Sequence, residues 1–167
     1  FTIDPETARD LDDAISYRQL SDDRFEIGVH IADVSYFIKE NTLLDLIASD
    51  RATSVYLVSK VIPMLPHIFC QDLCSLNPGQ DKLTFSAIIT VNNYGQVLDR
   101  WFGRTVINSC CKLSYELAQK LIESDDDNKL DESIFPQLYG PWSLSEIGQR
   151  VRHLHIIAKT LRRNRQE

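Results

Sequence analysis

Residues 84–107 read TFSAIITVNNYGQVLDRWFGRTVI, which is two β-prone segments joined by a short polar turn. Apolar and polar positions alternate in residues 84–91, the pattern of a strand that buries one face. Residues 92–95, Asn-Asn-Tyr-Gly, predict the turn, and residues 97–107 predict the returning strand. The side chains expected to point inward are Phe85, Ala87, Ile89 and Val91. A hairpin of this length indicates a largely antiparallel sheet.

A second hairpin is predicted upstream of the first. Residues 12–17 and 25–31 flank a turn at residues 21–23, Ser-Asp-Asp, and the later strand again alternates with a period of two. Its expected inward side chains are Phe25, Ile27, Val29 and Ile31. Residues 55–62 form a further strand-like run that ends before Pro63.

Helices are predicted around these strands. One starts at Thr42, which resembles a capping partner of Asp45. A second has a leucine at every fourth position and ends before residues 125–127, an acidic triplet that predicts a solvated loop; the leucines are Leu113, Leu117 and Leu121. The last begins with the capping box at residues 143–146, Ser-x-x-Glu, and carries an apolar stripe. We therefore predict an α+β fold, with a mixed, largely antiparallel sheet flanked by helices, in one domain over residues 1–167.

Composition excludes several classes of protein. The 167 residues include 24 Asp and Glu against 18 Lys and Arg, a formal net charge of −6, so overall charge alone would not hold a nucleic acid. No stretch approaches the roughly 18–20 apolar residues of a membrane helix, and no membrane partner is expected. The cysteine spacing does not match a paired zinc motif and favours reduced, mostly buried thiols; the cysteines are Cys70, Cys74, Cys110 and Cys111.

Residues 2–15, TIDPETARDLDDAI, carry the strongest chemical signal, because four aspartates fall within ten positions. They are Asp4, Asp10, Asp12 and Asp13. Two carboxylates about 5 Å apart repel by roughly 3 kcal/mol at an effective dielectric constant of 20, so a converging set must be hydrated, protonated or neutralised by a cation. Oxygen ligands without Cys or His suit Mg²⁺ or Mn²⁺, and magnesium readily shares its shell with phosphate. The residues favour metal-dependent phosphate chemistry.

Two other interpretations of these aspartates can be compared. An EF-hand loop starting at Asp10 fails, because Ala14 stands where an oxygen ligand is required and Ile15 where glycine is required. Aspartates that only cap turns would explain Asp4 and Asp10. They would hardly explain the adjacent pair at residues 12–13, which enters a strand where Asp is disfavoured. Turn capping stays as the alternative to a metal site.

Five motifs, in order along the chain, resemble the catalytic RNB domain of the RNase II/RNase R superfamily. They are residues 3–14 (IDPETARDLDDA), 30–37 (HIADVSYF), 51–57 (RATSVYL), 63–66 (PMLP) and 73–78 (LCSLNP). Residues 74–86 and the variant at residues 52–54, Ala-Thr-Ser, further resemble the eukaryotic RNase R-like branch that works apart from the exosome and prefers oligouridylated RNA. The family domain is longer than this chain, so the resemblance implies that residues 1–167 are its N-terminal half.

The resemblance implies a magnesium-dependent, processive 3′-to-5′ exoribonuclease that hydrolyses single-stranded RNA, including oligouridylated 3′ ends, to nucleoside 5′-monophosphates. By motif position the family's active-site aspartates, which hold the metal and orient the attacking water, correspond to Asp4, Asp10, Asp12 and Asp13. The resemblance further implies that Tyr56 stacks on the 3′-terminal base and that Tyr115 contacts the ribose, where RNA differs from DNA. An RNA substrate and reduced thiols together predict a cytoplasmic location.

Two features outside the acidic segment have simpler interpretations. His30 alternates with apolar residues and is expected to hydrogen-bond within the sheet, because a metal would already generate the nucleophile without a general base. Basic residues on the last helix either follow an RNA backbone or form a solvated face that complements the helix dipole. These are Arg150, Arg152, Lys159, Arg162, Arg163 and Arg165.

The chain also departs from the family. The second half of the family domain carries a catalytic arginine, so the resemblance implies that a longer parent protein degrades RNA while residues 1–167 alone are inactive or nearly so. Gln166 stands where the branch usually has an aromatic residue. One rival hypothesis is a non-catalytic RNA-binding or scaffold protein that keeps the fold, which loss of an aspartate would indicate. The other is a phosphohydrolase that acts on small nucleotides. Tyr56 and the set of five family motifs disfavour it.

Overall fold

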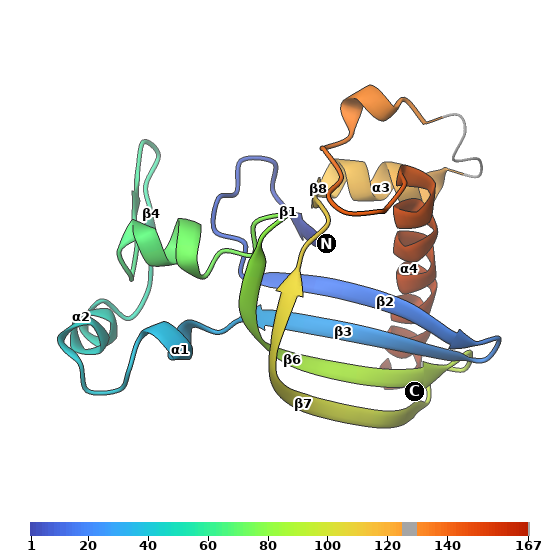
Figure 1. The fold of residues 1–167 in the computed structure, drawn as a ribbon, viewed down its shortest axis with the longest axis horizontal. Helices are drawn as coiled ribbons and strands as arrows, with labels where there is room; N and C mark the ends of the chain where they lie inside the picture. The colour runs from blue at the N-terminus through green and yellow to red at the C-terminus, as the bar shows by residue number, and fades with distance from the viewer. Residues whose placement is uncertain (125–129, 167) are drawn as a thin grey trace.

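A four-stranded antiparallel sheet forms the centre of the protein. The computed structural model describes residues 1–124 and 130–166, and its main sheet has the order β2-β3-β6-β7 (Figure 1). The strands are β2 (Asp13–Ser21), β3 (Arg24–Ala32), β6 (Asp81–Asn92) and β7 (Val97–Asn108). Both predicted hairpins are confirmed. The helices that flank the sheet confirm the predicted α+β class.

Two smaller sheets stand beside the main one. β1 (Thr2–Asp4) pairs in parallel with β8 (Lys112–Ser114), which joins the start of the chain to its middle. β4 (Val55–Tyr56) and β5 (Val61–Ile62) form a short antiparallel hairpin. The prediction of one continuous strand over residues 55–62 was wrong, because the Leu57 N–H donates to the carbonyl of Lys60 at 2.9 Å and closes a turn.

Helices connect and cover these sheets. They are α1 (Val34–Phe37), α2 (Leu43–Arg51), η1 (Ile68–Leu73), α3 (Tyr115–Glu123), η3 (Glu132–Ile134) and α4 (Leu144–Gln166). The predicted capping box is present, since the Ser143 N–H donates to Glu146 Oε2 at 2.8 Å and the Glu146 N–H to Ser143 Oγ at 3.3 Å. Among the described helices, none has the length and apolar composition to cross a membrane.

The start of α3 differs from its prediction. Leu113 belongs to β8, and the helix begins two residues later, because the Ser114 hydroxyl caps it by accepting the Leu117 N–H at 3.2 Å. The predicted solvated loop at residues 125–127 lies outside the described residues.

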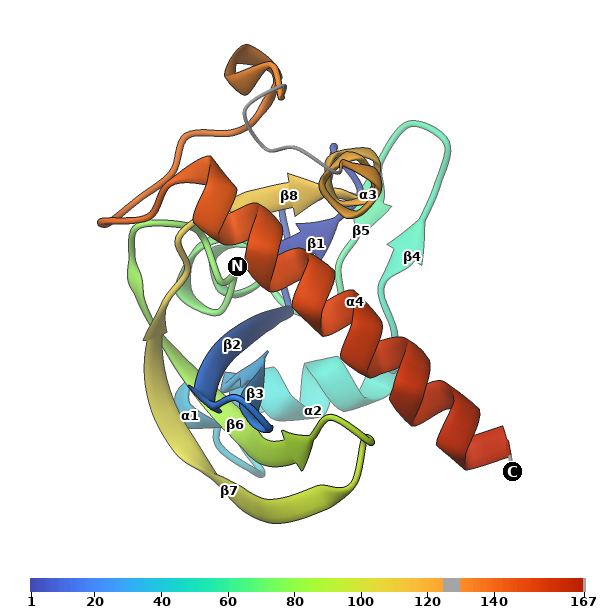
Figure 2. The same cartoon turned by 90° about the vertical axis from the view of Figure 1, so that its right-hand side faces the viewer.

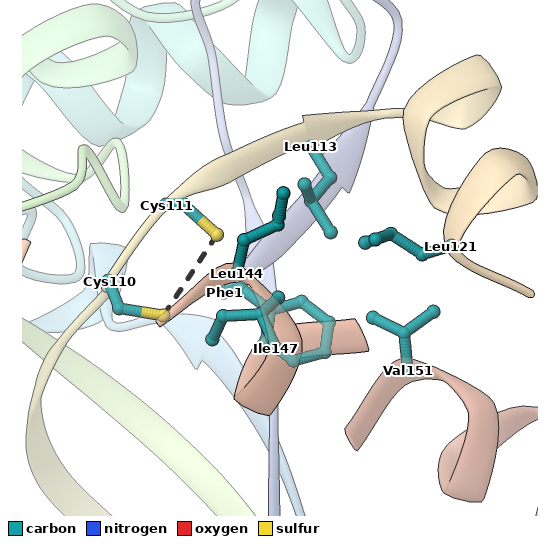
Figure 3. Close-up of a cluster of buried hydrophobic side chains, with 8 residues drawn as sticks. All are labelled: Phe1, Cys110, Cys111, Leu113, Leu121, Leu144, Ile147 and Val151. Carbon is teal, nitrogen blue, oxygen red and sulfur yellow. Dashed lines mark hydrogen bonds between the residues drawn. The ribbon is translucent and has the colours of Figure 1, made fainter. Parts of the chain in front are cut away.

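Three apolar clusters hold the elements together. The largest joins β8, α3 and the N-terminal part of α4 around Leu121 and Ile147, and it includes Cys110 and Cys111 (Figure 3). Further along, α4 crosses the main sheet (Figure 2) and packs its Ile157 against buried sheet residues. The third cluster lies beside the acidic segment and contains Leu11, Ala14, Ala32, Cys74 and Leu76. All four cysteines are unbridged thiols.

The burial of side chains on one face of the main sheet differs from the prediction. Val91 is buried as expected, but Phe85 is 51% exposed and Ile31 is 48% exposed, whereas Thr84 and His30 on the opposite face are buried. α4 packs on the expected inward face around Phe25 and Val91, with Ile27 and Ile89 partly buried beside them. At the other end of the sheet the cluster that contains Leu11 and Leu76 supplies the core. A period of two predicts alternation, but it does not say which face meets a neighbour.

Candidate active site

The acidic segment is a loop held between two strands. Asp4 ends β1, opposite Ser114 of β8, and Asp13 begins β2, opposite Ile31 of β3. The carbonyl of Asp12 accepts the Ala32 N–H at 2.9 Å, which extends the β2–β3 pairing into the loop. Both ends of the four-aspartate motif are therefore fixed by backbone pairing.

Two side chains far away in the sequence hold the loop between those ends. Lys112 Nζ donates to the carbonyls of Glu6 at 2.8 Å and Ala8 at 2.6 Å. The buried Ser75 hydroxyl accepts the Leu11 N–H at 3.0 Å and donates to the carbonyl of Arg9 at 3.1 Å. Neither role could be predicted from the sequence, because no local pattern marks a side chain that hydrogen-bonds to a distant backbone.

Three of the four predicted aspartates line one cleft. Asp4, Asp10 and Asp12 border a space of about 620 Å³, whose other wall includes Tyr56 of β4 and Cys70 of η1. Asp13 is exposed beside this cleft and is not among its lining residues. The fold thus brings most of the predicted acidic site to one opening.

The carboxylates affect one another's protonation. Burial raises the pKa of Asp4 from 3.8 and the Thr2 hydroxyl lowers it; the carboxylates of Asp13 and Asp10 raise it, while Lys112 opposes them. Asp12 reaches the surface, but partial burial at the cleft wall raises its pKa too, followed by the effects of Asp10, Asp13 and Asp4. Crowded negative charge of this kind favours a bound cation or a bound proton.

The donors at this cleft are carboxylate oxygens, which is the ligand type that hard divalent cations take. Asp4 lines the cleft, and its Oδ2 is buried without a hydrogen bond of good geometry, although the nearby Thr2 hydroxyl still lowers the pKa of this carboxyl. Across residues 1–124 and 130–166, no three His, Cys, Asp or Glu side chains converge closely enough to count as a metal site as they stand. An unpartnered buried oxygen beside two further carboxylates nevertheless has the chemistry that Mg²⁺ and Mn²⁺ prefer.

The two predicted RNA-contacting tyrosines are placed differently. The Tyr56 hydroxyl donates to Asp10 Oδ2 at 3.2 Å, and its ring is 68% exposed at the cleft. The Asp10 carboxylate raises the pKa of Tyr56 above its ordinary value of 10.0, which keeps the phenol a neutral donor. Tyr115 is the first residue of α3, next to Ser114 and so one residue beyond the partner of Asp4. It is 57% exposed and does not line the cleft.

His30 has the structural role that the sequence predicted. Its Nδ1 lies 2.7 Å from the Ser86 hydroxyl and its Nε2 lies 2.9 Å from the Ser16 hydroxyl, which ties β3 to both neighbouring strands. Gly28 makes this possible, because a Cβ there would overlap with Ser16 Oγ and His30 Nε2. Burial lowers the pKa of His30 below 6.5 and favours the neutral ring.

The basic residues of α4 divide into two groups. The Arg150 guanidinium lies 4.5 Å from the centre of the Trp142 ring, and Arg152 donates to the carbonyl of Leu121 at 2.9 Å. These two side chains therefore support the packing of α4. For Lys159 and residues 162–165 both interpretations stand, an RNA contact and a solvated helix end.

Together the sheet, the covering helix and the carboxylate-lined cleft define an α+β domain with an acidic site. The chain matches the RNB domain family over residues 1–167 and belongs to that family. It is 56% identical over 165 residues to "DIS3-like exonuclease 2" of Xenopus tropicalis, an alignment covering 99% of this chain and 20% of that protein. The fold matches Mycoplasma genitalium RNase R in complex with ribose methylated single-stranded RNA, with a TM-score of 0.82 and 28% identity over 99% of this chain and 24% of that one.

The family includes members whose names deny activity. The chain is 48% identical over 164 residues to "Inactive exonuclease DIS3L2" of Arabidopsis thaliana, covering 98% of this chain and 15% of that protein. The family is thus one of exonucleases and ribonucleases that also contains inactive members. The chain spans about a fifth or less of the length of these two relatives.

Proposed function

We propose that the parent protein, meaning the longer polypeptide in which residues 1–167 form part of an RNB domain, is a processive 3′-to-5′ exoribonuclease that requires Mg²⁺ and releases nucleoside 5′-monophosphates. One observation carries the proposal: Asp4, Asp10 and Asp12 share a cleft with the exposed ring of Tyr56. Carboxylates and an aromatic platform on one opening are what hydrolysis at the end of a single strand requires.

Asp4, Asp10 and Asp12 would hold the magnesium, or manganese in its place, with Asp13 at the edge of the site. When bound, the metal lowers the pKa of a water and stabilises charge on the leaving oxygen. The protein's own part is to keep the carboxylates in place. Lys112 and Ser75 do this through the loop backbone, so the acidic groups stay together despite their mutual repulsion.

Two tyrosines would contact the RNA substrate. The Tyr56 ring offers a π face that stacks on any base, worth roughly 1–3 kcal/mol per stacked base, so sequence tolerance is expected. Tyr115 would contact the ribose, where a phenol can recognise a 2′-hydroxyl. We extend the proposal to single-stranded 3′ ends that carry oligouridine, on the strength of the motif at residues 74–86.

A non-catalytic RNA-binding protein is the second candidate. The inactive Arabidopsis relative favours it, because 48% identity to a protein named inactive shows that the fold alone does not imply activity. Against it stands the complete set of aspartates at residues 4, 10, 12 and 13.

One experiment separates the two candidates. The purified parent protein is incubated with 5′-labelled single-stranded RNA, and with DNA of the same sequence, in Mg²⁺ and then in excess chelator. With RNA in Mg²⁺ we expect the 5′ label to move to a short end product with few intermediates, and chromatography to detect the released, unlabelled nucleoside 5′-monophosphates; DNA and chelator should leave the substrate intact. RNA that is bound but not shortened would establish the non-catalytic candidate. Residues 1–167 alone serve as a comparison and are expected to release little or nothing.

A further inference from the structure

The β4–β5 hairpin is attached to the protein mainly at its base. It stands away from the main sheet (Figure 1), and Val58 at its turn is fully exposed. Arg51 Nη1 donates to the carbonyl of Pro63 at 2.8 Å, and the Ser54 hydroxyl accepts the Met64 N–H at 2.9 Å. Both hydrogen bonds lie where the hairpin joins the chain, so they fix its root but leave its upper part unsupported.

One hydrogen bond links the hairpin strands to the acidic loop. Among the described residues, the donation from the Tyr56 hydroxyl to Asp10 Oδ2 at 3.2 Å is the side-chain hydrogen bond that joins β4 to residues 4–13. The two residues are 46 positions apart in the sequence. This contact therefore sets how far the hairpin stands from the carboxylates.

The Tyr56–Asp10 pair also lies between two spaces. Both residues line the acidic cleft, and both line a neighbouring cleft of about 420 Å³ with apolar walls. The apolar walls include Ile31, Met64 and Phe69. Movement of the Tyr56 ring would change the width of both openings at once.

We propose that the Tyr56 hydroxyl is a positioning group, separate from the stacking role of the ring. By donating to Asp10 it orients that carboxylate toward the cleft and holds the hairpin at a fixed distance from the acidic loop. A base that stacks on the ring is then placed at a set distance from Asp10. The inference rests on the proposed function, because orientation of Asp10 affects catalysis only if the cleft is catalytic.

Tyr56→Phe in the parent protein tests the hydroxyl alone, since phenylalanine keeps the π face. We expect kcat to fall roughly two- to tenfold, the effect of one net hydrogen bond, while the Kd for RNA in chelator stays within about twofold of wild type. Tyr56→Leu, which removes the ring as well, should weaken RNA binding in addition. Tyr94→Phe is the matched control, because Tyr94 is 72% exposed and lies in the β6–β7 turn.

A second measurement needs neither metal nor turnover. Hydrogen–deuterium exchange of the metal-free protein should show faster exchange over residues 55–62 in Tyr56→Phe than in wild type or Tyr94→Phe. Unchanged exchange there would overturn the inference, and so would an unchanged kcat in an active enzyme. An equal loss of kcat and RNA affinity in Tyr56→Phe and Tyr56→Leu would overturn it as well. If the wild-type parent does not shorten RNA, the proposed function fails, and hydrogen exchange still decides whether the hydroxyl holds the hairpin.

Discussion

The two walls of the cleft are built differently. The acidic loop is paired to strands at both ends and is bonded in between by Lys112 and Ser75, and the apolar cluster around Leu76 lies beneath it. The opposite wall, the β4–β5 hairpin, has exposed side chains and is attached at its root and through Tyr56. One wall is held by many contacts and the other by few.

This difference suits the two tasks of the proposed site. Carboxylates that repel one another keep their geometry only if the backbone beneath them cannot relax. The stacking ring of Tyr56 stands on a hairpin with few other contacts, so the hydrogen bond to Asp10 is what sets its distance from the carboxylates. Substitutions in the acidic loop are therefore expected to have larger effects than substitutions in the hairpin.

The largest effect is expected at the acidic loop. Asp12→Asn in the parent protein removes a charge from the cleft and should lower the cleavage rate by at least about 10²–10³-fold, while RNA binding stays nearly intact. Single-turnover cleavage of labelled RNA and a binding titration in chelator measure the two quantities. Undiminished turnover would remove Asp12 from the catalytic set.

Lys112→Met should loosen the same loop without touching a carboxylate. It removes the two donations to Glu6 and Ala8, and we expect the free energy of unfolding of the 167-residue chain to fall by about 1–3 kcal/mol. Urea denaturation measures the change. The exposed Lys39, changed to Met, is the control and should leave stability nearly unchanged. Equal stability of the two variants would show that Lys112 does not hold the loop.

The free energy of unfolding is expected to depend on pH because of His30. Burial lowers its folded-state pKa below 6.5, so the unfolded chain binds more protons in the window between the folded and unfolded values. The contribution of neutral His30 to stability is complete when the pH is above the pKa that His30 has in the unfolded chain. It is lost as the pH falls from that pKa through the lower folded-state pKa. Thermal unfolding of the chain between pH 7.5 and 5.5 should show stability decreasing toward acid, and His30→Gln should flatten the slope. The raised pKa values of Asp4 and Asp12 have the opposite sign, because the folded protein then binds more protons than the unfolded chain, so the difference between wild type and His30→Gln isolates the histidine.

The smallest effect is expected at the hairpin turn. Val58 is fully exposed, so Val58→Ser should change the free energy of unfolding by less than about 0.5 kcal/mol. Leu121→Ala in the buried cluster, expected to cost about 2–5 kcal/mol, provides the contrast in the same urea titration. A loss at Val58 as large as that at Leu121 would show that the hairpin is packed more firmly than its exposure indicates.

Local sequence patterns predicted the elements whose cause is local. Alternation gave both long hairpins, and the Ser143–Glu146 capping box gave the start of α4, because these signals act within a few residues. The patterns failed at residues 55–62, where a turn divides an apolar run, and at Leu113, which a long-range pairing draws into β8. They also misplaced Phe85, since exposure depends on which face α4 covers.

The candidate site divides in the same way. Crowding within residues 4–13 indicates acidic chemistry without any structure, because repulsion among neighbouring carboxylates follows from their spacing. The sequence alone does not show that Lys112 holds this loop from about a hundred positions away, or that Tyr56 bonds to Asp10. Such contacts arise only when packing brings distant segments together.

By itself, then, the sequence determined the two long hairpins, the capped helix starts at Thr42 and Ser143, the acidic motif and the resemblance to the RNB family. Only the tertiary structure decided which sheet face is buried, which aspartates share the cleft, and that the phenol of Tyr56 meets the carboxylate of Asp10. The physical reason is range: propensity and charge crowding act between near neighbours along the chain, whereas burial and hydrogen bonding between segments depend on how the chain closes on itself.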